Sequence, residues 1–322
     1  MSTKCPISII IPTIERITDL QICLNSILAQ SVLPEEIIIV DQSEQNTIEL
    51  FFDKWSREHS SKVGTKYFRV QDKSLTRAKN FGKSKISQSC KYVAFLDDDV
   101  ELTPSFLKEV FSFFQTQSQY GVLSANILLN ETTAPIKKIL NFFWHLYSRF
   151  FMLDSNGDGH IRSNGMPTYL TKLNPNEIKT VQTISGGASI FKKEITEVFF
   201  FDENLKGYCS MEDVDAGHRL CKKWLCAKSE SPKLWHHVSP VNRQKVNYAT
   251  SQFVQNYSYL FKKNSPQTTQ NIIIFLWSLI GLLGRYIMLS VLKNNPRYFL
   301  GYISGLLKII SNRYDTLYEE GK

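Results

Sequence analysis

The 322-residue sequence lacks the two glycine-rich patterns that commonly mark a phosphate-binding loop. No G-x-G-x-x-G follows the first strand-like run, which argues against a dinucleotide-binding fold. G-x-x-x-x-G-K-[ST] occurs nowhere, which argues against a P-loop enzyme. The chain also lacks a nucleic-acid-binding motif and a basic stripe interleaved with aromatic residues, so we expect no nucleic-acid partner.

Cysteine is scarce and scattered along the chain. The six cysteines include no C-x₂-C pair, which argues against zinc and disulfides and favours free thiols in a reducing cytosol. Residues 6–12 form a strand-like run that is too short for the apolar core of a secretory signal. We therefore expect no such signal at this end of the sequence.

Positive charge is concentrated towards the end of the sequence. The net charge is +8, and residues 261–322 hold eight Lys or Arg but only three Asp or Glu. Apolar residues make up 43% and charged residues 21%, as in ordinary globular proteins. A basic segment without a nucleic-acid motif fits an anionic membrane surface or an anionic substrate.

Strand-like and helix-like segments alternate over the first 130 residues. Helices are expected from Thr18 or Asp19 to about residue 29, up to about residue 59, from Ser74 to about residue 88, and from Thr103-Pro104 onwards. Strands are expected at residues 7–11, 36–40, 66–70 and 92–96. This alternation predicts an α/β fold with a doubly wound, mostly parallel sheet.

Three adjacent carboxylates, Asp97-Asp98-Asp99, directly follow the strand expected at residues 92–96. In open α/β sheets, ligands bind outside the carboxyl ends of the strands. Packing does not require three carboxylates that repel one another, whereas a hard divalent cation such as Mg²⁺ or Mn²⁺ offsets the repulsion. The alternative is a solvated turn. Asp41 ends an earlier strand, so we expect it to face the same crevice.

Two further segments could contact a phosphorylated ligand. The first is Pro12-Thr13 at the end of the first strand, with Glu15 close behind. The second is the helix start at residues 74–82, which bears two cations, Arg77 among them. Helix N-termini and cationic side chains both favour phosphate. Together with the carboxylates, these segments predict a site for a nucleoside diphosphate.

These motifs resemble those of family 2 glycosyltransferases with the GT-A fold. The matching motifs occur in the order expected of that family: Pro12-Thr13, Val40-Asp41-Gln42-Ser43, Leu75-Thr76-Arg77-Ala78-Lys79-Asn80-Phe81-Gly82, Leu96-Asp97-Asp98-Asp99 and Glu212-Asp213-Val214-Asp215. The resemblance covers roughly residues 6–244, about three quarters of the chain. It implies a GT-A, Rossmann-like sheet followed by a C-terminal hydrophobic helical region.

The resemblance implies a role for each residue on the donor side. Thr13 and Glu15 would flank the nucleoside, Asp41 would contact the base, and Arg77 would lie near the diphosphate. Asp97 and Asp99 would form the metal-binding pair, with Asp99 the direct ligand and Asp97 nearer the ribose or a metal-bound water. The full set expected to bind the nucleotide is Pro12, Thr13, Glu15, Asp41, Arg77, Asp97, Asp98, Gly186 and Gly187.

The acceptor side is expected after residue 180. Two glycines, Gly186-Gly187, precede a strand, where a backbone can approach a ligand closely. The resemblance implies Asp213 as the general base and Glu212 as its alternate or orienting partner. An acidic helix N-terminus is also what the helix dipole favours, so a structural role is the alternative. His236 would complete the metal shell, and mixed nitrogen and oxygen ligands would favour Mn²⁺.

The last part of the chain is apolar and basic. Residues 272–292 could span a membrane by length, but Arg285 lies among them, and an arginine near a helix centre costs about 2.5–3.5 kcal/mol on insertion scales. Residues 298–310 are too short to span and include Lys308. We expect helices lying on the cytoplasmic face of a membrane, peripheral or monotopic. A span and a soluble helical hairpin in a cytoplasmic protein are the alternatives.

Three regions are expected: a nucleotide-sugar-binding half over residues 1–130, an acceptor-binding half over 131–245 and a membrane-associated helical tail over 246–322. Within the second, the aromatic-rich residues 137–153 predict an amphipathic helix, packed on the sheet or, as the alternative, in contact with a membrane.

The predicted function is an inverting glycosyltransferase of the hexosyltransferase type in cell-surface polysaccharide synthesis. Its expected partners are a nucleoside-diphosphate sugar, foremost a UDP-sugar, a glycan or lipid-linked acceptor, and a membrane surface, with Mn²⁺ or Mg²⁺ as cofactor. Two alternatives belong to other classes. A metal-dependent nucleotidyl- or phosphotransferase would also need clustered aspartates, and a non-catalytic, membrane-attached protein could keep the fold without the chemistry.

Overall fold

The protein is described by a computed structural model that covers residues 4–128, 135–153, 156–170, 172–205, 208–239, 241 and 244–311, with the backbone alone for residues 135–142. The chain divides into two compact units. The first comprises residues 1–129, 172–203 and 220–243, and the second comprises residues 130–171, 204–219 and 244–322. Each unit is described by itself.

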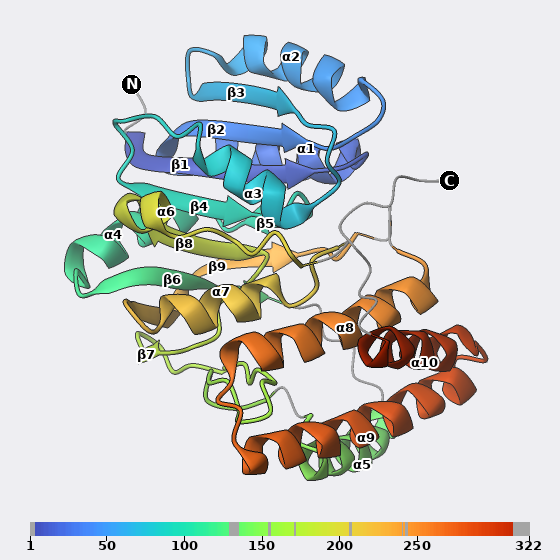
Figure 1. Cartoon of the computed structure of the whole chain (residues 1–322). Coiled ribbons are helices and arrows are strands. Elements are labelled where there is room, and N and C mark those ends of the chain that lie inside the picture. The colour runs from blue at the N-terminus through green and yellow to red at the C-terminus, as the bar shows by residue number, and fades with distance from the viewer. Residues whose placement is uncertain are drawn as a thin grey trace. The chain divides into compact units, whose positions relative to one another are not determined.

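The first unit is built on one nine-stranded sheet (Figure 1). The order is β3-β2-β1-β4-β8-β6-β9-β5, and β7 also pairs with β9. The strands are β1 (Lys4–Thr13), β2 (Leu33–Asp41), β3 (Gly64–Arg69), β4 (Tyr92–Leu96), β5 (Val100–Leu102), β6 (Tyr120–Leu128), β7 (Ile178–Thr180), β8 (Ala188–Lys192) and β9 (Leu225–His236). β3, β2, β1 and β4 are parallel, whereas β8 runs antiparallel to β4 and β6. The α/β fold class is confirmed, with a mixed sheet whose first four strands are parallel.

Helices cover both faces of the parallel strands. They are α1 (Ile17–Leu28), α2 (Thr47–His59), α3 (Leu75–Lys83), α4 (Phe106–Thr116) and α6 (Lys193–Val198). Successive strand residues point to opposite faces. In β1, Ile9 and Ile11 therefore join the core cluster that includes residues of α1, α2 and α4, while Ile10 meets Gly82 of α3 on the other face.

Several helix boundaries differ from the sequence expectation. α1 begins after Arg16 and not at Thr18 or Asp19, so those two residues lie inside its first turn. Ser74 caps α3 as predicted, but the helix ends at Lys83 and not near residue 88, with Ser84 at its C-cap. Between the aspartates and α4 lies β5, which is three residues long and was not predicted. Such short elements carry too few residues to show a period.

The second unit is helical. Its helices are α5 (Pro135–Phe150), most of α7 (Glu212–Leu220), α8 (Val246–Asn264), α9 (Thr269–Leu292) and α10 (Arg297–Ile310). Figure 1 shows α5 alongside α9 at the edge of this unit. The aromatic side chains of α5 contact α9, since Tyr147 Oη donates to the carbonyl of Gly281 at 2.6 Å. The helix therefore packs on another helix, where sequence analysis favoured the sheet.

Candidate active site

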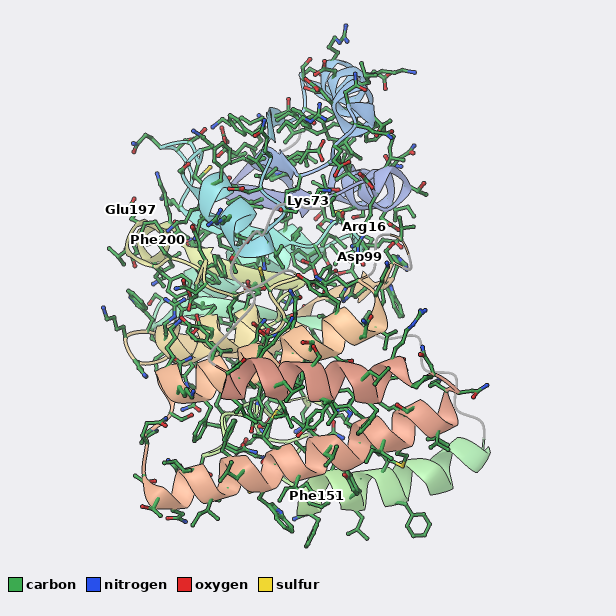
Figure 2. All side chains as sticks on the ribbon, turned by 45° about the vertical axis from the view of Figure 1, so that its right-hand side comes forward. Arg16, Lys73, Asp99, Phe151, Glu197 and Phe200 are labelled. Carbon is green, nitrogen blue, oxygen red and sulfur yellow. The ribbon has the colours of Figure 1, made fainter. Side chains whose placement is uncertain are left out.

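The ends of β1 and β4 meet in a buried polar network. Thr13 Oγ1 donates to Asp98 Oδ2 at 2.8 Å, and Arg16 Nη1 lies 3.1 Å from Asp98 Oδ1. The same guanidinium nitrogen lies 3.7 Å from Asp99 Oδ2, and Figure 2 shows Arg16 and Asp99 close together. Both Arg16 and Asp98 are buried. Asp98 is therefore engaged by the protein itself, and its burial is partly compensated by a cation and a hydroxyl group.

The segment after β9 folds around Asp99. The side chain of His236 places Nε2 at 3.0 Å from Asp99 Oδ1, and the backbone N–H of Ser239 donates to Asp99 Oδ2 at 2.8 Å. The backbone N–H of His237 donates to the Asp99 carbonyl at 2.9 Å. Val238 adopts a φ of 51°, a strained conformation for a β-branched residue. This strained residue lies in the turn from which one imidazole and two backbone N–H groups contact Asp99.

Asp97 is the most accessible of the three aspartates. Its side chain is 28% exposed, against 4% for Asp99, and its Oδ2 lies 4.0 Å from His236 Nε2. The backbone N–H of Asp97 donates to the Gly187 carbonyl at 3.1 Å. A methyl group on Gly187 would lie only 3.1 Å from Asp97 Oδ2. Glycine at this position therefore leaves room directly beside the carboxylate.

The environment moves the pKa values of two of these carboxyls in opposite directions. Burial raises the pKa of Asp98 to about 7, although Arg16 and Thr13 favour the charged form. Burial acts on Asp99 in the same sense, but the hydrogen bonds from His236 and Ser239 outweigh it and lower the pKa of Asp99 to about 2. Asp99 is thus held as a carboxylate.

The ligand atoms available at this site fit a divalent metal ion, and they belong to Asp97, Asp99 and His236. One ligand atom from each residue lies within 4.8 Å of the others. Two atoms that bind one ion at about 2.1 Å lie at most about 4.2 Å apart, and the His236 distances of 3.0 and 4.0 Å meet that limit. Carboxylate oxygen and imidazole nitrogen suit Mn²⁺, and oxygen alone suits Mg²⁺. The three predicted metal ligands are therefore brought together.

Asp41 lies at the end of β2, paired in register with Thr13 of β1. It is fully buried, its Oδ1 accepts from the Ser43 N–H at 2.8 Å, and its Oδ2 accepts from Tyr67 Oη at 2.6 Å. A carboxylate has further lone pairs, so it can still accept a base N–H. Glu15 has a φ of 53°, and its backbone N–H donates to Ser43 Oγ at 2.8 Å. Glu15 therefore lies at the same edge of the sheet as Asp41.

The two cations nearest the start of α3, Arg77 and Lys79, have different surroundings. Arg77 is one-third exposed and pairs with Asp72 at 2.9 Å, with Glu203 lying 3.6 Å from its Nε. A bound diphosphate would compete with those two carboxylates. Lys79 is buried, and its Nζ donates to the Gly186 carbonyl at 3.2 Å. Lys79 therefore fixes the Gly186-Gly187 backbone beside Asp97.

The acidic helix start of α7 belongs to the second unit. Asp215 is fully buried and accepts from Arg219 Nη2 at 2.7 Å, from Lys263 Nζ at 2.7 Å and from Asn264 Nδ2 at 2.9 Å. These bonds join α7 to α8. Asp215 therefore has a packing role in this unit.

Glu212 and Asp213 form the first turn of α7. Glu212 is buried, whereas Asp213 is half-buried, with its Oδ1 accepting from the Val214 N–H at 2.9 Å. Tyr169 lies near both carboxylates. Its burial raises the pKa of the phenol well above its usual range, and the negative charges of Asp213 and Glu212 raise it further. Met211, just before the helix, has a φ of 70°.

The loop that carries Tyr169 contains a hollow of about 550 Å³. Its lining residues are Gly157, Asp158, His160, Arg162 and Thr168. The Thr168 hydroxyl donates to Asp158 Oδ1 at 3.0 Å and also accepts from the His160 N–H at 3.0 Å. These bonds define the hollow, in the same unit as the α7 carboxylates.

Sequence analysis gave no role to Arg16, Tyr169 and Ser239, and it counted Lys79 only as the second cation of residues 74–82. Their partners lie far away in the sequence: Asp98 is 82 positions from Arg16, and Asp99 is 140 positions from Ser239. A spacing pattern does not reveal such partners. The cation pair on α3 and the histidine at the end of β9 were the only local signals.

The sheet order and the acidic strand end define the class of the protein as a GT-A-type α/β fold. A sequence model of Glycosyl transferase family 2 matches residues 8–200. The match covers more than half of the chain, so the protein belongs to glycosyl transferase family 2, and the resemblance drawn from the motifs is confirmed. Members of this family are glycosyltransferase enzymes.

The chain is also similar in sequence to a known protein. Minor teichoic acid biosynthesis protein GgaA of Bacillus subtilis (strain 168) is 22% identical over 203 residues, which are 62% of this chain and 40% of GgaA. The chain thus spans about two fifths of that relative.

Solved structures share the fold at low sequence identity. Staphylococcus aureus TarS has a TM-score of 0.54 and 15% identity over 95% of this chain and 50% of its own. Its 1–349 fragment in complex with UDP-GlcNAc has a TM-score of 0.56 and 14% identity, over 95% of this chain and 83% of the fragment. The mannosyltransferase PcManGT of Pyrobaculum calidifontis, in complex with GDP-Man and Mn²⁺, has a TM-score of 0.57 and 10% identity, over 97% and 89%.

Proposed function

We propose that the protein is an inverting glycosyltransferase that moves a sugar from a nucleoside-diphosphate sugar to a hydroxyl group of a glycan or lipid-linked acceptor. The observation that carries the proposal is the group of Asp97, Asp99 and His236 at the end of β4. Family membership supports the reaction class. The TarS complex with UDP-GlcNAc and the PcManGT complex with GDP-Man support a nucleotide-sugar donor, and a UDP-sugar is our first choice.

The first unit would hold the donor. Asp97, Asp99 and His236 would bind Mn²⁺ or Mg²⁺, and such an ion supplies positive charge next to the two phosphates of the donor. Asp99 is pre-oriented for this task by His236 and Ser239. Arg77 would exchange its contacts with Asp72 and Glu203 for the diphosphate, since a phosphate binds a guanidinium in the same bidentate way as a carboxylate.

The remaining donor residues would position the nucleoside and the sugar. Asp41 would accept a hydrogen bond from the base, with Tyr67 and Ser43 fixing its carboxylate. Thr13 and Glu15, after β1, would flank the nucleoside. Four further residues would shape the donor site without contacting the donor through a free side chain. Asp98 is held by Arg16, and Gly187 leaves space beside Asp97. The other two are Pro12 and Gly186.

The second unit would supply the base. Asp213 would accept the proton of the acceptor hydroxyl while that oxygen attacks the anomeric carbon from the face opposite the diphosphate. The new C–O bond forms as the bond to the diphosphate breaks, and the nucleoside diphosphate leaves. A single displacement inverts the configuration. Glu212 would orient Asp213 or the acceptor, and the hollow lined by Arg162 and His160 could receive polar groups of the acceptor.

The cellular setting of the proposal is cell-surface polysaccharide synthesis at the cytoplasmic face of the membrane. The likeness to a teichoic acid biosynthesis protein supports the polysaccharide part. Among the described residues, α9 is the one helix long and apolar enough to cross a membrane. The basic, apolar helices around it support attachment to the membrane surface.

The experiment that tests the proposal is a donor screen on the full chain. Thermal shift and slow nucleotide release are measured for a panel of nucleotide sugars with Mn²⁺, Mg²⁺ or EDTA. The proposal predicts a metal-dependent shift and metal-dependent release of nucleoside diphosphate for one donor. A folded protein that responds to no donor, or that releases pyrophosphate or a nucleoside monophosphate, would contradict it.

A further inference from the structure

Helix α9 has three faces, two of which are covered by the protein. One face packs on α8 and α10, where Phe275 stacks on Phe261 with ring centres 4.2 Å apart. On the same face, Tyr286 lies 5.7 Å from Tyr302. Within an 18-residue apolar window of α9, only 22% of the residues are buried. Most of this helix is therefore not core.

The second face of α9 packs on α5. Trp277 Nε1 donates to the Phe150 carbonyl at 3.0 Å, and Tyr147 Oη donates to the Gly281 carbonyl at 2.6 Å. A methyl group on Gly281 would come within 2.4 Å of Phe151 Cβ, so the glycine allows the helices to approach closely. Figure 2 shows Phe151 where α5 and α9 run side by side. α5 and α9 thus form one packed pair.

The third face of α9 is exposed and apolar, and α5 continues it. The exposed apolar residues of α9 at helical spacing are Ile273, Leu276, Ile280, Ile287 and Val291. Those of α5 are Phe143, Leu146 and Phe150, of which Phe143 and Phe150 are 63% and 64% exposed. The ring of Phe150 lies 5.2 Å from that of Trp277, and this contact joins the two faces. We call these eight residues of α5 and α9 the apolar surface.

Arg285 does not interrupt the apolar surface. Its guanidinium carbon lies 5.3 Å from the ring centre of Trp144, on the side of α9 that faces α5. A cation over an aromatic ring is stabilised by the ring quadrupole, and the aromatic residues of α5 thus accommodate this charge. The arginine that argued against a membrane span is therefore turned away from the exposed face.

The helices around the apolar surface carry positive charge only. Residues 135–150 and 246–310 contain nine Lys or Arg and no Asp or Glu. Arg149, Lys293 and Arg297 are exposed near the ends of α5, α9 and α10. An apolar face on helices whose own charged residues are all basic complements an anionic lipid leaflet in both hydrophobicity and charge.

We propose that the exposed faces of α5 and α9 form one docking surface on an anionic membrane, with α9 lying along the interface and not across the bilayer. If α9 crossed the bilayer, the helices packed on it, α8 and α10, would also lie in the hydrocarbon core. α8 has buried amides at Gln252, Gln255 and Asn256, and α10 is 14 residues or about 21 Å long, too short for a core of about 30 Å. The proposal does not depend on which sugar is transferred.

The test is flotation of the full chain with vesicles of phosphatidylcholine containing about one third phosphatidylglycerol. The triple variant Phe143→Ser, Leu146→Ser, Phe150→Ser removes the α5 part of the surface. The matched control is Leu50→Ser, Val198→Ser in the first unit, where both side chains are similarly exposed at 62% and 67%. The proposal predicts at least a tenfold drop in the partition coefficient for the triple variant and no change for the control.

Three results would overturn the proposal. The first is wild-type vesicle binding by the folded triple variant, or by Phe143→Glu alone if the triple variant fails to fold. The second is equal wild-type binding to vesicles without phosphatidylglycerol. The third is a wild-type dimer in lipid-free buffer that becomes a monomer in the triple variant while vesicle binding is kept, because the surface would then join two copies. Donor thermal shifts in lipid-free buffer test the transferase separately.

Discussion

Each of the two units carries a short acidic run, and in both runs one carboxylate has a structural role. In the first unit this is Asp98, which a buried arginine and a threonine hold at the end of β4. In the second it is Asp215, which accepts from Arg219 and Lys263. Each run contributes to the proposed site, but in each run one of the buried carboxylates is bound to neighbouring cations.

The two runs differ in how their remaining carboxylates are held. Asp99 receives bonds from the His236 side chain and the Ser239 backbone, which fix both of its oxygens before any ligand binds. Asp213 is half-buried in the first turn of α7. In the proposed function Asp99 binds the metal ion, and a metal ligand gains from a fixed position; Asp213 is the proposed base, which must meet a new acceptor molecule in each turnover. The predictions below separate these roles.

The largest expected effect is on turnover in Asp213→Asn. Loss of the base should lower kcat about 10²–10⁴-fold, because general base catalysis contributes about that much. The metal-dependent thermal shift with the donor should stay within twofold of wild type in apparent affinity. Transfer and donor binding are measured on the same preparation. Full turnover by this variant would favour phosphoryl or nucleotidyl transfer.

The next effect is on stability in Asp98→Asn. This change leaves the buried Arg16 guanidinium without its closest carboxylate and should lower the free energy of unfolding by about 3–5 kcal/mol. Urea unfolding gives the value. The control is Asp72→Asn at the half-exposed pair with Arg77, which should change stability by less than about 1 kcal/mol. Equal losses in the two variants would remove the distinction between buried and surface pairs.

A smaller loss of stability is expected for Asp215→Asn. The aspartate is buried, but Arg219 and Lys263 are each about one quarter exposed and can turn to solvent. The free energy of unfolding should fall by about 1.5–3 kcal/mol, the value of hydrogen bonds to a charged group. Donor binding by thermal shift should be unchanged. A loss of donor binding without a loss of stability would place Asp215 in the site.

The smallest effect is expected for Gly187→Ala. The added methyl would lie 3.1 Å from Asp97 Oδ2, closer than an ordinary contact, and would displace that carboxylate. The metal-dependent donor affinity should fall about tenfold, or about 1.4 kcal/mol, while the unfolding midpoint stays close to wild type. Titration calorimetry with the donor and Mn²⁺ checks both the affinity and the metal dependence. Unchanged affinity would argue that the donor does not approach Asp97.

Local features of the fold could be predicted from the sequence. β4 at residues 92–96 and the Ser74 cap of α3 were predicted because a run of apolar residues and a capping serine act over a few positions. The predicted start of α1 at Thr18 or Asp19 was wrong. The helix begins after Arg16, and the side chain of Arg16 is held by residues far away in the chain. Local propensity does not contain such contacts.

The candidate site shows the same limit. The acidic strand end, His236 and the start of α7 were visible as motifs, and the structure groups Asp97, Asp99 and His236. The different contacts of the carboxylates within an acidic run could not be predicted from the sequence, because Asp98 and Asp99 are neighbours with the same side chain. Their partners, Arg16 and Ser239, lie 82 and 140 positions away. Only the folded arrangement distinguishes them.

The measurement that tests the central claim most directly is titration calorimetry of Mn²⁺ and the donor found by the screen, on wild type, Asp99→Ala and His236→Ala. The account predicts tight donor binding to wild type only when Mn²⁺ is present, and loss of that dependence in both variants, with His236→Ala keeping the wild-type fold by circular dichroism. Equal donor affinity with and without Mn²⁺ in wild type, or unchanged metal-dependent binding in the folded His236→Ala protein, would contradict the claim that these residues form the donor site.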